Sequence, residues 1–248
     1  MNISFFVFCI GLIFGSFANV LIYRIPRHLD YVYGRSFCPS CYHQLNMVDM
    51  IPLLGWIVNR GKCKYCSCDI SIQYPIVELI GGCLFLLFYM RDGWGILFVF
   101  ESLLCMILLI ISCIDYRLMI IPDELVIMFF MVSLGTIFYE KIFFLERILG
   151  VFCLSLPLYL MNILYKESFG GGDMKLLAVC GFYLGWKKLL VGMCLAVFTA
   201  SLFCLLFIFC KKADKQTFIP FAPFISIGMF IVMLYGDFLL NWYLNIFL

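Results

Sequence analysis

The chain has 248 residues, of which 65% are hydrophobic and 13% are charged, and its formal net charge is +2. This composition excludes an ordinary soluble domain and predicts an all-α, polytopic membrane protein surrounded by lipid bilayer. The small net charge gives no indication of a nucleic-acid partner.

About eight apolar stretches are expected to cross the membrane. In chain order they are residues 3–23, 74–90, 95–114, 120–138, 143–165, 174–186, 189–210 and 223–248. The sixth is short against the roughly 20 residues that a helix needs to cross the hydrocarbon, so a tilted or partly submerged span is expected there. The first lacks a charged leader and a small-residue cleavage site, which favours a retained helix over a signal peptide.

We predict two parts, divided after the long polar loop. Residues 1–72 would hold the first span and that loop, and residues 73–248 a helical bundle. Twelve of the 17 basic residues lie in the loops 24–72, 115–119, 165–175 and 211–216, namely Arg24, Arg27, Arg35, Arg60, Lys62, Lys64, Arg117, Lys166, Lys175, Lys211, Lys212 and Lys215. The positive-inside rule therefore predicts that these loops face the cytoplasm.

The 14 cysteines form two groups. Nine lie in the apolar stretches, where a free thiol behaves as a small hydrophobe: Cys9, Cys83, Cys105, Cys113, Cys153, Cys180, Cys194, Cys204 and Cys210. The other five lie in the polar loop. Two Cys-x-x-Cys pairs, Cys38 with Cys41 and Cys63 with Cys66, predict a closed, structural zinc site of four thiolates. Cys68 is an alternative ligand to Cys66, and a disulfide pair is an alternative that a reducing cytoplasm disfavours.

Two aspartates lie where the chain is expected to leave the bilayer on the cytoplasmic side. They are Asp115 and Asp173, and Asp173 closes the run Gly170, Gly171 and Gly172. A carboxylate at membrane depth is costly unless it faces a polar cavity or a partner, so it is a functional candidate. Paired carboxylates share a proton, activate water and polarise a carbonyl group, which predicts an aspartyl hydrolase. Glycines without a Cβ let an extended substrate approach closely.

Other acidic residues are assigned supporting roles. Asp123 follows Pro122 at an expected helix start, where a carboxylate favours the helix dipole. Glu78, in the second stretch, is expected to hydrogen-bond to a facing helix or to the polar site. Glu167 is expected to orient the loop or to tune Asp173.

Several short motifs occur in order along nearly the whole chain. Those of the N-terminal half are Gly15-Ser16-Phe17-Ala18-Asn19-Val20, Tyr23-Arg24-Ile25-Pro26, the two Cys-x-x-Cys pairs with Ile51-Pro52 between them, and Tyr74-Pro75-Ile76-Val77-Glu78. Those of the C-terminal half are Ile114-Asp115, Pro122-Asp123, Glu167, Gly170-Gly171-Gly172-Asp173, Lys175 and Ile219-Pro220-Phe221. Together they resemble the type IV prepilin peptidases, a family of bifunctional enzymes of the bacterial inner membrane.

The resemblance implies cleavage of the leader peptide of prepilins or pseudopilins, followed in many members by methylation of the new N-terminus with S-adenosylmethionine. Asp115 and Asp173 correspond to the catalytic pair. Ala222, before Pro223, departs from the glycine that is common there. Gly61 and Lys62 are candidate contacts of S-adenosylmethionine, although a turn with a solvated lysine explains them equally well.

Two other functions compete with this prediction. A proton-coupled transporter could use Asp115, Asp173 and Glu78 as a proton relay, but no inverted repeat or pair of broken helices is visible in the sequence. A zinc-bearing membrane scaffold would leave the two aspartates unexplained.

Overall fold

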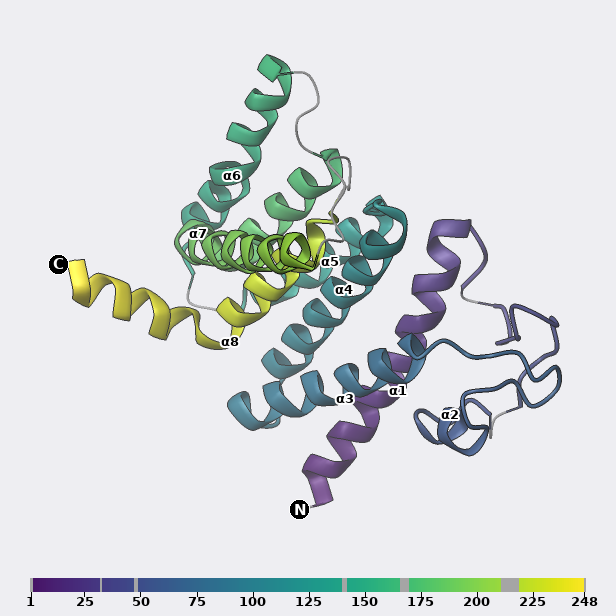
Figure 1. Ribbon diagram of the computed structural model, residues 1–248. Helices are drawn as coiled ribbons and strands as arrows, with labels where there is room; N and C mark the ends of the chain where they lie inside the picture. Colours follow the sequence, from purple (N-terminus) through teal and green to yellow (C-terminus); the bar gives the residue numbers. More distant parts are fainter. Residues whose placement is uncertain are drawn as a thin grey trace. The chain divides into compact units, whose positions relative to one another are not determined.

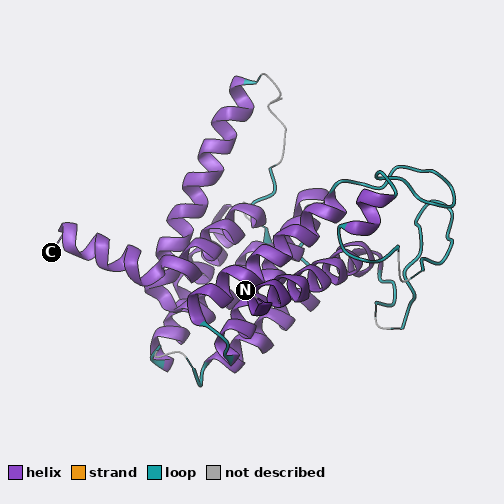
Figure 2. Ribbon diagram, turned by 90° about the horizontal axis from the view of Figure 1, so that it is seen from below, coloured by secondary structure: helices purple, strands orange, loops and turns teal. Residues whose placement is uncertain are grey.

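The computed structural model describes residues 2–31, 33–46, 49–139, 142–165, 170–210 and 219–247. Its elements are α1 (Asn2–Arg24), the 3-10 turn η1 (Ile25–Arg27), α2 (Leu54–Val58), α3 (Gln73–Asp92), α4 (Ile96–Leu118), α5 (Asp123–Thr136), α6 (Phe144–Tyr165), α7 (Gly171–Phe209) and α8 (Ala222–Phe247). These described residues form helices and loops and contain no strand beyond two isolated bridges, as Figure 2 shows. The predicted all-α class is confirmed.

The chain divides into two compact units, Met1–Ser102 and Leu103–Leu248, with the boundary inside α4. In the first unit, α1 packs against α3 (Figure 1). The helices approach closely because glycines face each other: a Cβ added to Gly11 would lie 2.5 Å from the carbonyl oxygen of Gly81. Small residues at such crossings are typical of helix packing in membranes. The functional division predicted after residue 72 stays a prediction.

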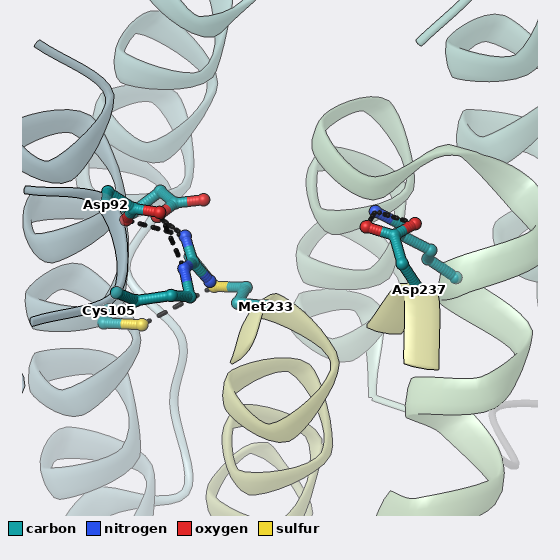
Figure 3. A network of polar contacts seen from close by, with 7 residues as sticks. Asp92, Cys105, Met233 and Asp237 are labelled. Atoms are coloured by element: carbon teal, nitrogen blue, oxygen red, sulfur yellow. Dashed lines mark hydrogen bonds and ion pairs between the residues drawn. The ribbon is translucent and has the colours of Figure 1, made fainter. Parts of the chain in front are cut away.

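In the second unit, α7 contacts α5, α6 and α8. Gly150 of α6 meets Gly181 of α7 so closely that a Cβ on either would collide with the other's carbonyl oxygen. On α4, Cys105 Sγ lies 3.5 Å from Met233 Sδ of α8 (Figure 3), and the Ser226 hydroxyl donates to the carbonyl of Leu108. These contacts join the helices that carry the candidate site.

The predicted count of eight spans is not confirmed. In the described part of the chain, six helices are long and apolar enough to cross a membrane: α1, α3, α4, α6, α7 and α8. α5, within the fourth predicted stretch, has only 14 residues. The sixth and seventh stretches both fall in α7, whose 39 residues are interrupted at one position only.

That interruption lies at Gly185, whose φ of 73° and ψ of 165° are not helical. A break leaves the carbonyls of the preceding turn without intrahelical partners. Arg147 of α6, which is fully buried, donates from Nη1 to the carbonyls of Phe182 and Tyr183, both at 3.2 Å. A buried arginine from a neighbouring helix therefore caps the first segment of α7.

Candidate functional site

Asp115 lies on the last turn of α4 and is 6% exposed. Its Oδ2 accepts a hydrogen bond of 3.0 Å from the backbone N–H of Ala222, the first residue of α8. The next residue, Pro223, has no N–H to offer. The positive end of α8 therefore faces one carboxylate through a single main-chain donor, which favours the ionised form of that carboxylate.

Asp173 lies in the first turn of α7. Its Oδ1 is buried and has no hydrogen-bond partner among the described residues. The carboxylates of Asp173 and Asp115 are close enough to interact electrostatically. Beside them, a Cβ added to Gly170 would lie 3.0 Å from Asp173 Oδ2, so a side chain there would crowd the carboxylate.

The neighbouring predicted residues support the start of α7. A Cβ at Gly172 would lie 2.8 Å from the Cβ of Ile121, whereas nothing described lies within 4 Å of one at Gly171. Lys175 Nζ forms an ion pair of 2.7 Å with Asp123 Oδ1, at the start of α5, and both side chains are exposed. This pair joins the starts of α5 and α7. Glu167 falls outside the described residues.

Glu78 belongs to the other unit, where it holds the polar loop. It lies in α3, and its Oε2 accepts the backbone N–H of Leu53 at 2.8 Å. The Glu78 carboxyl group also hydrogen-bonds the Ser16 side chain. Glu78 was predicted to hydrogen-bond to a facing helix or to the polar site. Its partners are Ser16 on the facing helix α1 and Leu53 in the polar loop.

Two further polar residues organise the first unit, and sequence reasoning did not single them out. Arg24, buried at the end of α1, donates to the carbonyls of Asp30, Gly34 and Arg35. Asn19 donates to the carbonyl of Tyr74 at 3.0 Å. Both belong to the quoted motifs, but their spacing alone does not reveal that backbone carbonyls are their partners.

The two cysteine pairs lie in matching turns. In each, the residue after the second cysteine has a positive φ (Tyr42, 57°; Ser67, 59°) and donates its N–H to the carbonyl of the first cysteine at 2.8 Å. The bridges Phe37–Gln44 and Lys62–Asp69 flank the two turns at the same spacing. The His43 ring lies against the Tyr65 ring, with centroids 3.7 Å apart.

The four predicted cysteines form a cluster that could hold a metal ion. The sulfur atoms of Cys38, Cys41, Cys63 and Cys66 all lie within 4.8 Å of one another, and those of Cys38 and Cys66 are 3.9 Å apart. Tetrahedral thiolates about 2.3 Å from zinc would lie roughly 3.8 Å apart, so the spacing fits that ion. The carbonyl of Cys68 accepts the N–H of Cys63, just as the carbonyl of His43 accepts the N–H of Cys38 in the first turn. Cys68 is not one of the four clustered cysteines.

The thiol of Cys41 is not ionised readily without an ion. The backbone N–H of His43 lowers the pKa of Cys41, but desolvation and the thiols of Cys66 and Cys38 raise it overall to about 12. A cation bound here would therefore displace protons from the cluster.

Gly61 has a structural explanation. Its φ is 72°, a Cβ there would lie 2.9 Å from the Trp56 ring, its N–H bonds the carbonyl of Trp56, and its carbonyl accepts the N–H of Ile70. Lys62 is exposed. Since both backbone polar groups of Gly61 are used within the loop, the structure identifies no cofactor contact there, and the assignment of Gly61 and Lys62 to S-adenosylmethionine stays a prediction.

Comparison with known proteins adds the family. Residues 9–91 match the bacterial Peptidase A24 N-terminal domain, and residues 102–209 match the type IV leader peptidase family. The chain is 32% identical to a prepilin leader peptidase/N-methyltransferase of Bacillus subtilis over 96% of this chain and 97% of the relative. It is 30% identical to the protein of that name from Aeromonas hydrophila, over 98% and 94% of the two chains.

A prepilin leader peptidase/N-methyltransferase of Legionella pneumophila is also 30% identical, over 93% of this chain and 91% of the relative. No solved structure matches the chain. The motifs, the paired aspartates, the cysteine cluster and two family matches that together cover most of the sequence agree, and the chain is a multi-pass membrane protein that belongs to the type IV leader peptidase family.

Proposed function

We propose that this protein is a membrane aspartyl endopeptidase that removes the leader peptide of type IV prepilins or pseudopilins and then methylates the new N-terminus. The electrostatic contact between Asp115 and Asp173 carries the peptidase assignment, since two interacting carboxylates are the machinery that such hydrolysis needs. The relatives named as prepilin leader peptidase/N-methyltransferase support the substrate and the second activity. Family membership favours this function over a proton-coupled transporter.

The two aspartates take different roles. Asp115 accepts the N–H of Ala222 and serves as the ionised base, whereas Asp173, with a buried oxygen that lacks a described partner, carries the shared proton. Asp115 removes a proton from water while the water oxygen attacks the scissile carbonyl carbon, and Asp173 gives its proton to the carbonyl oxygen. When the C–N bond breaks, the leaving amine takes the proton from Asp115 and the new acid returns one to Asp173.

The glycines and the ion pair position this site. Gly170 and Gly171 leave room for an extended substrate beside Asp173, and Gly172 lets the start of α7 pack closely against Ile121. The pair of Lys175 with Asp123 holds the starts of α5 and α7 together. Glu167 is assigned a supporting role on the family resemblance alone.

The site faces the cytoplasm of the bacterial inner membrane. The basic residues Arg117 and Lys175, which lie close in sequence to Asp115 and Asp173, and those of the polar loop support this orientation, because lysine and arginine accumulate on the cytoplasmic side. Prepilin leaders are then cut on the side where the proteins are made.

Cys38, Cys41, Cys63 and Cys66 would hold a zinc ion, which would fix the conformation of the polar loop and take no part in the chemistry. S-adenosylmethionine would supply the methyl group for the second activity, and the polar loop, with Gly61 and Lys62, is the predicted place for it. Glu78 and Arg24 shape that loop.

The peptidase role is tested with Asp115→Asn and Asp173→Asn in proteoliposomes, with a prepilin peptide followed by mass spectrometry. Each variant should lose cleavage, because each removes half of the shared-proton pair. Asp237→Asn is a matched control, since Asp237 is exposed and pairs with Lys188 away from these helix ends (Figure 3). Cleavage near the wild-type rate by either site variant would contradict the assignment.

The second activity is tested with a precleaved peptide and labelled S-adenosylmethionine. Asp173→Asn should still transfer the label to the peptide amine, since this step needs no bond hydrolysis. Absence of label with the wild-type protein would restrict the function to proteolysis.

A further inference from the structure

The short helix α2 of the polar loop carries an apolar face that nothing described in the chain covers. Leu54, Ile57 and Val58 are spaced i, i+3 and i+4, which places them on one side of the helix. They are 56%, 59% and 76% exposed. Met50 and Ile51, just before the helix, are exposed as well. A water-surrounded loop would bury such a face.

The other side of α2 is turned inward. Gly55 is buried against the carbonyl of Asp49, Trp56 donates from its ring nitrogen to the carbonyl of Ile70 at 3.2 Å, and the Asn59 side chain donates to the carbonyl of Gly55. The loop therefore fixes which side of α2 points outward, and the outward side is apolar.

The loop is also fixed in depth. The N–H of Leu53, directly before α2, is bound at 2.8 Å by Glu78 of the membrane-spanning helix α3. Glu78 lies five residues after Gln73, the first residue of α3, which is about 7.5 Å along the helix axis. Helical side chains point toward the helix N-terminus, so the carboxylate lies within about one turn of that end. A spanning helix enters the headgroup region at this level.

The backbone at this anchor point is held in an unusual conformation. Leu53 has φ 61° and ψ −49°, and the N–H of Leu54 bonds the carbonyl of Pro52 at 2.7 Å, which together form a γ-turn. This turn is rare and strained for a residue with a side chain. The bond to Glu78 holds the turn and with it the direction of α2.

Charge follows directly after the apolar face. Arg60, Lys62 and Lys64 come next in the chain, and all three are exposed. An apolar face flanked by basic residues is the pattern of a segment that lies in the membrane interface and attracts anionic lipids.

We propose that residues 50–58 are an interfacial anchor that inserts Leu54, Ile57 and Val58 between the lipids beside α3, with Glu78 setting the depth. The partner is the bilayer, specifically anionic phospholipid next to Arg60, Lys62 and Lys64. The anchor would hold the polar loop flat on the membrane. It does not rest on any enzymatic activity.

The experiment uses the full chain in nanodiscs made of equal parts phosphatidylcholine and phosphatidylglycerol. Ile57 is replaced by the photoreactive p-benzoylphenylalanine, and a matched variant carries the probe in place of Asn59, on the opposite side of α2. After illumination, mass spectrometry should find a phospholipid adduct at position 57 and none at position 59. Equal adducts at both positions, no lipid adduct, or adducts to a second protein chain at position 57 would overturn the proposal.

Two further arms test the cause. Glu78→Ala should lower the lipid adduct at position 57 by roughly tenfold, the change that one hydrogen bond to a charged group supports, while Glu78→Gln keeps an acceptor and most of the adduct. An unchanged yield in Glu78→Ala would overturn the depth argument. The yield should fall in phosphatidylcholine alone, and an unchanged yield there would overturn the preference for anionic lipid.

Discussion

The two aspartates differ in their partners, and this difference decides their chemistry. Asp115 accepts one main-chain N–H, whereas the buried Oδ1 of Asp173 has no partner among the described residues. Hydrogen bonds to a carboxylate favour its charged form, and a neighbouring negative charge favours protonation. In the proposed mechanism, this difference makes Asp115 the base and Asp173 the acid before a substrate arrives.

The contact with Ala222 can be removed without removing a side chain of the site. Ala222→Pro deletes the N–H donor at the first position of α8, where proline fits a helix well. Loss of a hydrogen bond to a charged group, which contributes roughly 1.5–3 kcal/mol, should lower cleavage about 10- to 100-fold, and the proline Cδ, which replaces the hydrogen facing Asp115, should lower it further. The measurement is the single-turnover cleavage rate in proteoliposomes.

Ala222→Gly is the matched control, since it keeps the N–H and introduces the residue that is common in the family. It should cleave at close to the wild-type rate. Equal rates for Ala222→Pro and Ala222→Gly would show that the donor contributes nothing to the reaction.

Asp123 tests how far the site extends. Its ion pair with Lys175 joins two exposed side chains, and such pairs contribute about 0.2–1 kcal/mol. Asp123→Asn should therefore keep a cleavage rate within about fivefold of wild type, measured in the same assay. Complete loss of cleavage, with the protein still in the membrane, would place Asp123 among the catalytic groups.

At the scale of elements, α7 is defined by its break. Gly185 divides it into a first segment that begins at the candidate site and a second, longer one. Two separate spans were predicted for these residues because hydropathy drops at Trp186-Lys187-Lys188. The sequence does not reveal how the break is stabilised. The guanidinium of Arg147 caps the first segment, but a single arginine barely changes the mean hydropathy of an apolar stretch, so Arg147 was not singled out.

Gly185→Ala measures the cost of that break. The position has φ 73° and ψ 165°, a region open essentially to glycine only, where a Cβ costs about 1–3 kcal/mol, although the surrounding space would admit the methyl group. The free energy of unfolding in mixed micelles should fall by about that amount. Gly95→Ala is the matched control, because nothing described lies within 4 Å of a Cβ there and its φ is not positive. Equal stability of the two variants would contradict the strain argument.

At the scale of the whole molecule, the cysteine cluster and the aspartate pair lie in different units. The cysteine cluster was predictable because each Cys-x-x-Cys pair has a short, local spacing. The two aspartates, far apart in the sequence, were predictable because each lies where the chain is expected to leave the bilayer. The grouping of the four cysteines required only that two equal turns face each other. The hydrogen bonds from the N–H of Ala222 to Asp115 and from the N–H of Leu53 to Glu78 join segments that are far apart in the sequence. They depend on which segments come together in the fold, and no local pattern predicts that.

Removal of the metal should act on one unit only. Cys38→Ser combined with Cys63→Ser should abolish binding of one zinc per chain, and hydrogen exchange should then speed up in residues 33–46 and 49–72. Exchange in α7 should remain unchanged, because its packing involves α5, α6 and α8. Loss of protection in α7, or no change in the loop, would contradict a structural metal confined to the loop.

The donor to Asp115 belongs to the peptide bond, and this has a consequence for genetics. Every amino acid except proline supplies the same N–H, and the Ala222 side chain is fully buried, so a screen of side chains would record position 222 as a packing site and not as a hydrogen-bond donor. The group would become visible only through proline or through an amide-to-ester exchange made by chemical synthesis. A residue that looks like a packing site can thus supply a backbone atom on which the proposed reaction depends.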